Sequence, residues 1–469
     1  MDDLAKIFER QRENRWRIAK TSADQRIAKL KKLREAILNR REELHKAVYD
    51  DFRKNPAETD LTETHLVVSE LNDAIKHLRR WMRPHKVRTP ITLFGASSEI
   101  RYEPKGVVLI LSPWNYPFQL AVSPVIGAVA AGNCVILKPS NKTAHTARFL
   151  KKLMAEVFAE DEVAVLEGDH AVADALLEMP FDHIFFTGSP NIGKKVMAAA
   201  AKNLAPVTLE LGGKSPVIVD ETADVKKAAA RIMWAKFINA GQTCVAPDYL
   251  LVHEGRAKEF VEEAKRVVAS RYGSTEKDQA KSSDYCRLIS EQHRQGLQKI
   301  LEATIKSGAK VEMGGLSGSD GDGRFLAPTL LSNVTPDSPI MREEIFGPIL
   351  PILTFQTLNQ AIELIQSKDK PLALYIFSKD RRHVEEILNN TTAGGTCVNN
   401  LAIHLANSNL PFGGVGTSGM GSYHGFFGFK TFSHERAVLR QGAIDMVKIF
   451  YPPYTPRIKK IIRFLTKHL

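Results

Sequence analysis

Three segments of the sequence carry side chains that could take part in covalent or acid–base chemistry. The first is residues 241–244 (GQTC), where small and polar residues precede Cys244. A thiol acts as a nucleophile when it is accessible and forms a thiolate readily. Most lone cysteines, however, are inert residues of the core. The segment therefore permits a reactive Cys244 without excluding a structural one.

The second segment places Glu210 between two leucines and ahead of a Gly-Gly pair, in residues 209–214 (LELGGK). An ionised carboxylate is costly to bury. Glu210 is therefore either an acid that pairs with a cation or caps a helix, or a buried acid whose pKa is raised toward the working pH. An acid of the second kind suits general-base catalysis.

The third segment, residues 186–193 (FTGSPNIG), lies between a strand pattern and a helix pattern. Ser189 is placed to cap the helix, and Pro190 fits its first position. Backbone N–H groups at a helix start attract phosphate. Because the segment is not GxGxxG, it favours an ordinary strand-to-helix turn over a nucleotide site when taken alone.

The elements that must position these residues alternate between strand and helix patterns. Short apolar runs occupy residues 106–111, 134–137, 183–187 and 216–219, with helical patterns between them. This alternation predicts an α/β fold with a parallel, doubly wound sheet. Residues 106–137 carry no charge. Their three prolines, however, predict a buried strand, a loop, a helix and a second strand rather than a membrane span.

The composition is that of a soluble globular protein with a large core. The chain has 469 residues and a formal net charge of +12, with 43% hydrophobic and 25% charged residues. Its length suggests two or three domains. Half of the positive excess lies in residues 446–469, which contain no Asp or Glu, and no aromatic-basic RNA-binding signature occurs. We therefore expect no nucleic-acid partner.

The four cysteines and the N-terminus bear on compartment and metal content. None of the cysteines is paired at CxxC spacing, so we expect no metal site. Wide spacing in a long chain fits a reducing compartment better than a disulfide framework. The N-terminal segment MDDLAKIFERQRENR has no apolar core of a signal peptide. These features favour a cytoplasmic protein.

Six motifs in one order give the chain a family resemblance. They are PWNYP (113–117), LKPS (137–140), FTGS (186–189), LELGG (209–213), GQTC (241–244) and EEIFGP (343–348). Together they resemble the aldehyde dehydrogenase superfamily, from about residue 100 to about residue 430. The segments GQTCVAPDY and PFGGVGTSGMGSYHG are similar to the class 3 branch.

The resemblance implies a function and a role for each matching residue. The implied activity is oxidation of an aldehyde to a carboxylic acid with NAD(P)+. Cys244 matches the nucleophile and Glu210 the general base, and Asn115 matches the side chain that forms the oxyanion hole with the Cys244 backbone N–H. The implied cofactor contacts are Lys138 and Glu344 at the riboses, Phe346 beside the nicotinamide, and Gly188, Ser189 and Gly193 at the pyrophosphate.

The cofactor is expected to be NAD, and one departure from the family pattern extends this to NADP. Many NAD-preferring relatives have Glu after KPS, where it binds the adenosine ribose and would repel a 2′-phosphate; this chain has Asn141. A near alternative is a CoA-acylating dehydrogenase, which usually lacks the Glu that Glu210 represents. A second alternative is a catalytically silent protein, which should have lost Cys244, Glu210 or Asn115.

The resemblance also implies the domain organisation. A Rossmann-like cofactor domain would comprise residues 1–83 and 101–211, and an α/β catalytic domain residues 212–424. Segments 84–100 and 425–445 would bridge two subunits, since class 3 relatives suggest a homodimer. Residues 446–469 form a basic amphipathic pattern that can lie in a membrane interface or pack on a partner subunit. Its apolar positions are Ile458, Ile461, Ile462, Leu465 and Leu469.

Overall fold

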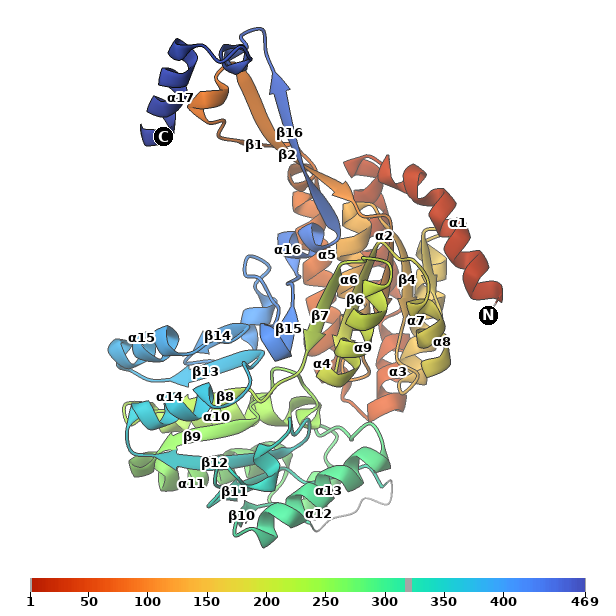
Figure 1. The fold of residues 1–469 in the computed structure, drawn as a ribbon. Coiled ribbons are helices and arrows are strands. Elements are labelled where there is room, and N and C mark those ends of the chain that lie inside the picture. Colours follow the sequence, from red (N-terminus) through yellow and green to blue (C-terminus); the bar gives the residue numbers. More distant parts are fainter. Residues whose placement is uncertain (1, 317–322, 469) are drawn as a thin grey trace.

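The chain folds around three β-sheets, which confirms the predicted α/β class. The computed structural model describes residues 2–316 and 323–468. Its sheets have six, seven and three strands, and Figure 1 shows that each belongs to a separate region of the molecule. Among the described residues, no helix combines the length and the apolar character needed to cross a membrane.

The six-stranded sheet is covered by helices on both faces. Alternate side chains of its buried strand β3 (Val107–Leu111) enter two different hydrophobic clusters, because successive side chains of a strand point to opposite faces. One cluster includes side chains of α2, α6 and α7, and the other includes side chains of α1, α8 and α9. The strand order is β15 (Gly419–Met420), β7 (Val207–Leu211), β6 (His183–Gly188), β3, β4 (Cys134–Lys138) and β5 (Val163–Val165). The helices of this region are α1 (Asp2–Ala19), α2 (Ala23–Asn39), α3 (Arg41–Phe52), α4 (Pro56–Thr59), α5 (His65–Trp81), α6 (Gln119–Ala131), α7 (Ala144–Val157), α8 (His170–Leu177), α9 (Pro190–Ala201) and α16 (Gly425–Thr431).

The seven-stranded sheet forms the second α/β layer. Its strands pair in parallel, except that β10 is antiparallel to β11. The order is β10 (Lys310–Met313), β11 (Thr329–Ser332), β12 (Ile349–Phe355), β9 (Tyr249–His253), β8 (Pro216–Val219), β13 (Ala373–Phe377) and β14 (Gly395–Val398). The helices are α10 (Val225–Phe237), α11 (Glu254–Tyr272), α12 (Glu276–Lys281), α13 (Glu291–Lys306), α14 (Leu358–Gln366) and α15 (Arg381–Asn390).

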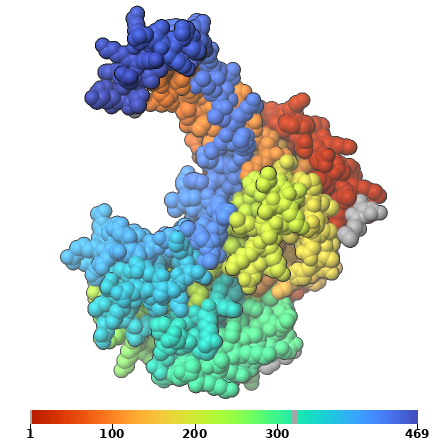
Figure 2. All heavy atoms as spheres, viewed as in Figure 1, coloured from red at the N-terminus to blue at the C-terminus, as the bar shows by residue number. Residues whose placement is uncertain are grey.

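The third sheet projects from the body as an arm, as Figures 1 and 2 show. Strand β2 (Ala96–Pro104) pairs antiparallel with β1 (His85–Val87) and along its whole length with β16 (Ser433–Gln441). The C-terminal helix α17 (Pro456–His468) lies at the far end of this arm and buries none of its residues. Segment 84–100, which was expected to bridge two subunits, therefore contains β1 and the first part of β2. Strand β16, from late in the chain, completes their sheet.

The local predictions agree with these elements. The apolar runs at 106–111, 134–137, 183–187 and 216–219 are strands β3, β4, β6 and β8, and the uncharged segment 106–137 folds as β3, a loop, α6 and β4. Helix α2 begins with the capping box formed by Ser22 and Gln25. The domain boundaries stay a prediction; strand β15, from the segment expected in the catalytic domain, joins the six-stranded sheet.

Candidate active site

Several of the residues predicted to do chemistry lie where two sheets approach each other. Strand β7 ends at Leu211, and residues 212–215 lead directly into Pro216, the first residue of β8. Pro216 is paired with Tyr249, the first residue of β9. Cys244 lies a few residues before Tyr249 in the chain. The carboxyl edge of the six-stranded sheet therefore faces the amino edge of the seven-stranded sheet, with Glu210 on one and Cys244 on the other.

The loop that carries Cys244 has an unusual backbone. It follows the short helix η3 (Ile238–Gly241), in which Asn239 and Ala240 have φ values of 52° and 50°. Gly241 has φ 75°, and a Cβ there would overlap the carbonyl oxygen of Gly347. Left-handed conformations of non-glycine residues persist only where the surroundings hold them, and they cluster at functional sites.

Gln242 holds this loop from inside. Its Nε2 donates to the carbonyl oxygens of Asn239 (3.0 Å) and Arg287 (3.1 Å), and its Oε1 accepts from the N–H of Ile289 at 2.9 Å. The side chain is fully buried. Gln242 therefore fixes the turn that presents Cys244.

Asn115 is bonded to the same loop. It lies in residues 112–118, between β3 and α6, and its Nδ2 donates to the carbonyl oxygen of Gln242 at 3.1 Å. Its own carbonyl oxygen accepts from Asn239 Nδ2 at 2.8 Å, and the next residue, Tyr116, hydrogen-bonds Thr243 through its hydroxyl at 2.7 Å. An amide nitrogen has two N–H groups. One of them in Asn115 is used here, which leaves the second available to another acceptor.

A buried ion pair that the sequence did not reveal supports the start of α6, and a neighbouring acid supports the loop before Cys244. Lys54 Nζ lies 2.9 Å from Glu63 Oε1, and both side chains are fully enclosed. The other oxygen of Glu63 accepts from the N–H groups of Phe118 (2.8 Å) and Gln119 (3.3 Å), at the start of α6. On the Cys244 side, Glu58 accepts from the N–H of Asn239 at 2.8 Å.

Glu210 is a buried acid without a partner. It lies on β7 opposite Thr187 of β6 and Gly419 of β15, and it is 3% exposed. Neither of its carboxyl oxygens forms a hydrogen bond within the described part of the chain. Burial raises the pKa of Glu210 well above its ordinary value. Of the two alternatives left by the sequence, the structure has the buried acid rather than the ion-paired or capping one.

Cys244 is half-buried, and its environment disfavours the thiolate. Burial raises the pKa of the Cys244 thiol to about 12, and the nearby carboxyl groups of Glu344 and Glu210 act in the same direction. The other three cysteines are buried. Nucleophilic attack by Cys244 therefore requires a base that accepts its proton or a positive charge placed beside it.

The predicted pyrophosphate turn lies at the carboxyl end of β6. A Cβ at Gly188 would lie 2.5 Å from Cζ of Phe186, and one at Gly193 would lie 2.8 Å from Cδ2 of Leu211, so both positions need glycine for close packing. Pro190 occupies the first turn of α9 as predicted, but the exposed Ser189 forms no side-chain hydrogen bond to that helix. Ser189 therefore occupies the predicted N-cap position without forming the side-chain bond of a cap. Pro190 has no N–H, and those of Ile192 and Gly193 donate to the carbonyl oxygen of Ser189, which leaves the N–H of Asn191 without a partner inside the helix.

Lys138 lies at the same edge of the sheet, at the end of β4. The register aligns Lys138 and Phe186 with Leu111 of the strand between them. Lys138 Nζ donates to the carbonyl oxygen of Pro139 at 3.1 Å, and burial lowers its pKa. Because β4 and β6 lie on opposite sides of β3, this edge is a switch point, where open α/β sheets bind ligands.

Glu344 and Phe346 approach from the second sheet, in the segment that precedes β12. The Glu344 carboxylate lies against Gly212, and burial raises its pKa to about 8. Phe346 has φ 49°, and its ring meets that of Trp114 edge-to-face at 5.3 Å. The two residues thus come from the region of the seven-stranded sheet, whereas Gly188 and Lys138 belong to the six-stranded sheet.

An apolar cavity of about 290 Å³ opens onto Cys244. Sequence patterns do not predict this cavity, because its lining comes from segments separated by hundreds of residues. It is lined by Leu61, Thr62, His65, Leu66, Tyr116, Gln119, Leu120, Trp234, Ala235, Ile238, Thr243, Cys244, Val245, Ala402, Ile403, Leu405, Ala406, Phe412, Tyr423 and His424.

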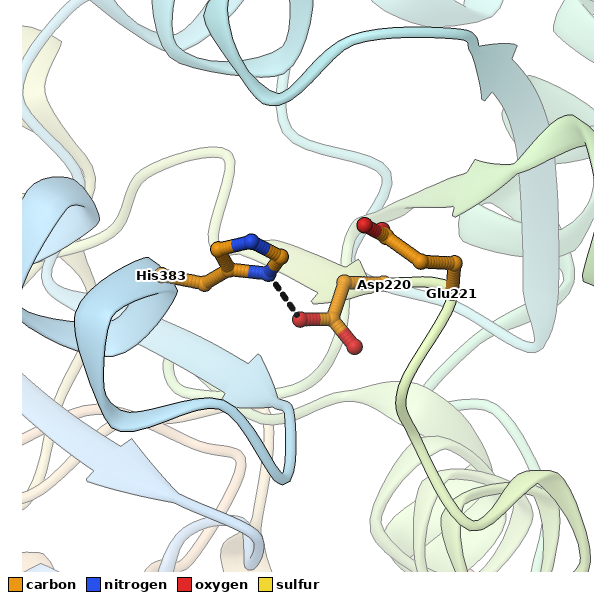
Figure 3. Close-up of side chains that lie close together, drawn as sticks. All are labelled: Asp220, Glu221 and His383. Atoms are coloured by element: carbon orange, nitrogen blue, oxygen red, sulfur yellow. Dashed lines mark hydrogen bonds and ion pairs between the residues drawn. The ribbon is translucent and has the colours of Figure 1, made fainter.

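A cluster of potential metal ligands lies elsewhere, at the end of β8. Figure 3 shows Asp220, Glu221 and His383, whose ligand atoms lie within 4.8 Å of one another. His383 Nδ1 is bonded to one oxygen of Asp220 at 2.9 Å, and the other oxygen accepts from the backbone and hydroxyl of Thr222. With both Asp220 oxygens engaged, we interpret the cluster as a link between β8 and α15.

Comparisons with known proteins agree with this geometry. The model of the aldehyde dehydrogenase family matches residues 2–438. Similar proteins include 4,4′-diaponeurosporen-aldehyde dehydrogenase of Staphylococcus aureus, 45% identical with 94% of both chains covered. Aldehyde dehydrogenase family 3 member B1 of Bos taurus is 43% identical, with 98% of this chain and 97% of that protein covered.

Solved structures show the same likeness. The substrate-bound state of Staphylococcus aureus AldH matches with a TM-score of 0.94 and 43% identity, over 98% of this chain and 99% of that one. The NAD+ complex of a Bacillus cereus aldehyde dehydrogenase matches with a TM-score of 0.86 and 25% identity, over 94% of this chain and 89% of that one. These findings confirm the predicted resemblance: the chain belongs to the aldehyde dehydrogenase family.

Proposed function

We propose that this enzyme oxidises apolar aldehydes to carboxylic acids with NAD(P)+ through a thioester on Cys244. The observation that carries the proposal is the position of Cys244: it borders the apolar cavity, within electrostatic reach of the partnerless acid Glu210. Two relatives are named for a diaponeurosporen aldehyde and for coniferyl aldehyde. Both names fit a cavity whose wall is mostly apolar.

The first chemical step is attack of the Cys244 sulfur on the aldehyde carbon. Because burial raises the pKa of both Cys244 and Glu210, Glu210 is a base matched to accept the thiol proton. The attack leaves a tetrahedral alkoxide bonded to sulfur. The free N–H of the Asn115 amide and the backbone N–H of Cys244 stabilise that oxygen; one such donor contributes about 3 kcal/mol.

Oxidation and hydrolysis complete the reaction. NAD(P)+, held by the residues assigned below, would supply the hydride acceptor, so that loss of hydride from the tetrahedral carbon would leave a thioester on Cys244. Glu210 releases the thiol proton to solvent and then takes a proton from water, the water oxygen attacks the thioester carbon, and the carbon–sulfur bond breaks. The acid is released and Cys244 is restored.

The residues around the cleft fit a dinucleotide. The N-terminus of α9, the positive end of the helix dipole, suits the pyrophosphate, and we assign pyrophosphate contacts to Gly188, Ser189 and Gly193. Lys138 and Glu344 are assigned to the riboses and Phe346 to the nicotinamide ring. Glycines at 188 and 193 keep the turn close-packed, which leaves the helix start accessible.

Acceptance of NADP follows from Asn141. This residue is exposed beside Lys138 and carries no charge that would repel a 2′-phosphate. We expect measurable kcat/KM with both cofactors, and NADP activity below a hundredth of NAD activity would reject this assignment. The variant Asn141→Glu should reduce NADP activity selectively.

Water as the acceptor of the acyl group separates this proposal from a CoA-acylating enzyme. Glu210 is the group that activates water, and a CoA-dependent relative would not need it. Stoichiometric release of acid without CoA supports the proposal. A requirement for CoA would favour the alternative instead.

The decisive experiment follows reduced cofactor spectroscopically with a panel of aldehydes. We expect activity in the wild type and none in Cys244→Ala, while the matched control Cys286→Ala, at a buried thiol, should retain it. Mass spectrometry of the protein quenched during turnover should show an acyl adduct on Cys244. Continued oxidation without any adduct would overturn the mechanism.

The arm is proposed to hold two subunits together and to touch a membrane surface. In α17, basic side chains alternate with exposed or half-buried apolar ones, and the described helix contains no acidic residue; Leu469 lies outside the described residues. Sedimentation should report a homodimer. Flotation with anionic vesicles should bind the wild type more strongly than a chain ending at Pro453, and equal flotation would reject membrane contact.

A further inference from the structure

Several polar groups of the apolar cavity already form hydrogen bonds within the protein. The Tyr116 hydroxyl is bonded to Thr243 at 2.7 Å. Gln119 Nε2 donates to Ser123 Oγ at 3.3 Å. A ligand in the cavity therefore meets mainly apolar atoms and hydroxyl or amide groups that already have partners.

His424 is different, because it offers an unused hydrogen-bonding atom in the wall. Its ring is 7% exposed, and Nδ1 lies 3.0 Å from Oε2 of Glu70, which is itself buried. A carboxylate only accepts, so Nδ1 carries the proton of this bond. The bond to Glu70 is the one side-chain hydrogen bond of His424 within the described part of the chain, and it leaves the other ring nitrogen, Nε2, without a partner there.

The ring is held rigidly in this orientation. It stacks on Tyr423 with ring centroids 3.9 Å apart, and Phe412 contacts it from another side at 5.6 Å. Both neighbours also line the cavity. Together with the bond to Glu70, this packing leaves Nε2 as the one ring atom that can bond a ligand.

The backbone at His424 argues that the imidazole is retained for a purpose. Its φ is 75°, a left-handed value that favours glycine. A non-glycine residue in such a conformation costs of order 1 kcal/mol or more. A glycine would remove this strain, so the histidine side chain must contribute something that offsets it.

We propose that His424, oriented by Glu70, binds a hydroxyl group of the aldehyde substrate at a point remote from the carbonyl. The inference rests on the proposed function and names its substrate class: apolar aldehydes that carry one hydroxyl group. A hydroxyl both donates and accepts. It therefore satisfies Nε2 whether that nitrogen presents a lone pair or a proton, which a carbonyl or an amine does not.

The test compares matched substrates that differ only in the hydroxyl. Alkanals from hexanal to dodecanal are paired with their ω-hydroxy counterparts, and cinnamaldehyde is paired with its ring-hydroxylated derivatives. The ratio of kcat/KM for hydroxylated over unsubstituted substrate should peak at one chain length or ring position, at about tenfold, the value of one net hydrogen bond. His424→Leu should bring that ratio to about one, whereas the control His65→Leu, at the exposed rim of the same cavity, should keep the wild-type ratio.

Two further variants keep the test decisive if His424→Leu folds poorly. His424→Gly relieves the left-handed backbone and should also abolish the hydroxyl preference. Glu70→Gln keeps a partner for Nδ1 but removes its charge, and it should lower the preference without removing it. A flat ratio in the wild type, or an unchanged ratio in both His424 variants, would overturn the inference. Failure to oxidise any aldehyde would instead overturn the proposed function.

Discussion

Breaking the ion pair between Lys54 and Glu63 is expected to destabilise the fold and to slow catalysis together. Both side chains are fully enclosed. Removing one partner of such a pair leaves an uncompensated charge in a low-dielectric interior, which costs about 3–5 kcal/mol. In Lys54→Met, the Glu63 carboxylate keeps only the N–H groups of Phe118 and Gln119. We expect the free energy of unfolding to fall by about that amount.

The catalytic effect follows from what Glu63 holds. Phe118 and Gln119 begin α6, directly after the loop of Asn115. A misplacement of about 1 Å at a reacting group can cost about a hundredfold in rate. The kcat of Lys54→Met should therefore fall between about tenfold and a hundredfold, while the KM for NAD, whose proposed contacts lie elsewhere, changes little.

The assay combines urea denaturation, followed by tryptophan fluorescence, with separate measurement of kcat and KM. The double variant Lys54→Met/Glu63→Gln is the matched control, because it removes both charges but keeps a side-chain oxygen for the α6 N–H groups. It should recover most of the lost stability. A loss below about 1 kcal/mol in Lys54→Met, or a double variant no more stable than the single one, would refute this reasoning.

Three other predictions follow from the site. The raised pKa of Glu210 makes its ionisation costly in the folded state, so the wild type should lose stability relative to Glu210→Gln as the pH rises above about 4.3, the ordinary pKa of Glu. The same variant should accumulate acyl-enzyme. Equal stability curves at all pH values would contradict the first expectation. Gly212→Ala places a Cβ against the carboxylate of Glu344, the proposed ribose contact. The KM for NAD should therefore rise several-fold more than the KM for aldehyde, as measured by initial-rate kinetics. An equal rise of the two KM values would argue against a cofactor contact. With a thiol pKa of about 12, Cys244 in the cofactor-free enzyme should be alkylated about tenfold faster for each pH unit from about pH 7 to about pH 10. Peptide mapping should show Cys244 reacting faster than the three buried cysteines. An alkylation rate that levels off near neutral pH would instead show a stabilised thiolate.

The sequence by itself determined the elements whose patterns are local. The apolar runs became β3, β4, β6 and β8, because buried parallel strands are apolar on both faces. The prolines of the uncharged segment were readable for the same reason, because each acts on its own few residues of backbone. Six ordered motifs supplied the family, and with it Cys244, Glu210 and Asn115 as candidates.

Tertiary structure decided what depends on residues that are distant in the chain. The cavity combines segments near residues 61–66, 234–245 and 402–424, and no local pattern encodes such a lining. The ion pair of Lys54 and Glu63 and the bond from His424 to Glu70 likewise join side chains only after the chain has closed on itself. Whether Glu210 was paired or isolated was also open in the sequence, because its burial, and its lack of a hydrogen-bond partner among the described residues, result from packing rather than from neighbouring residues.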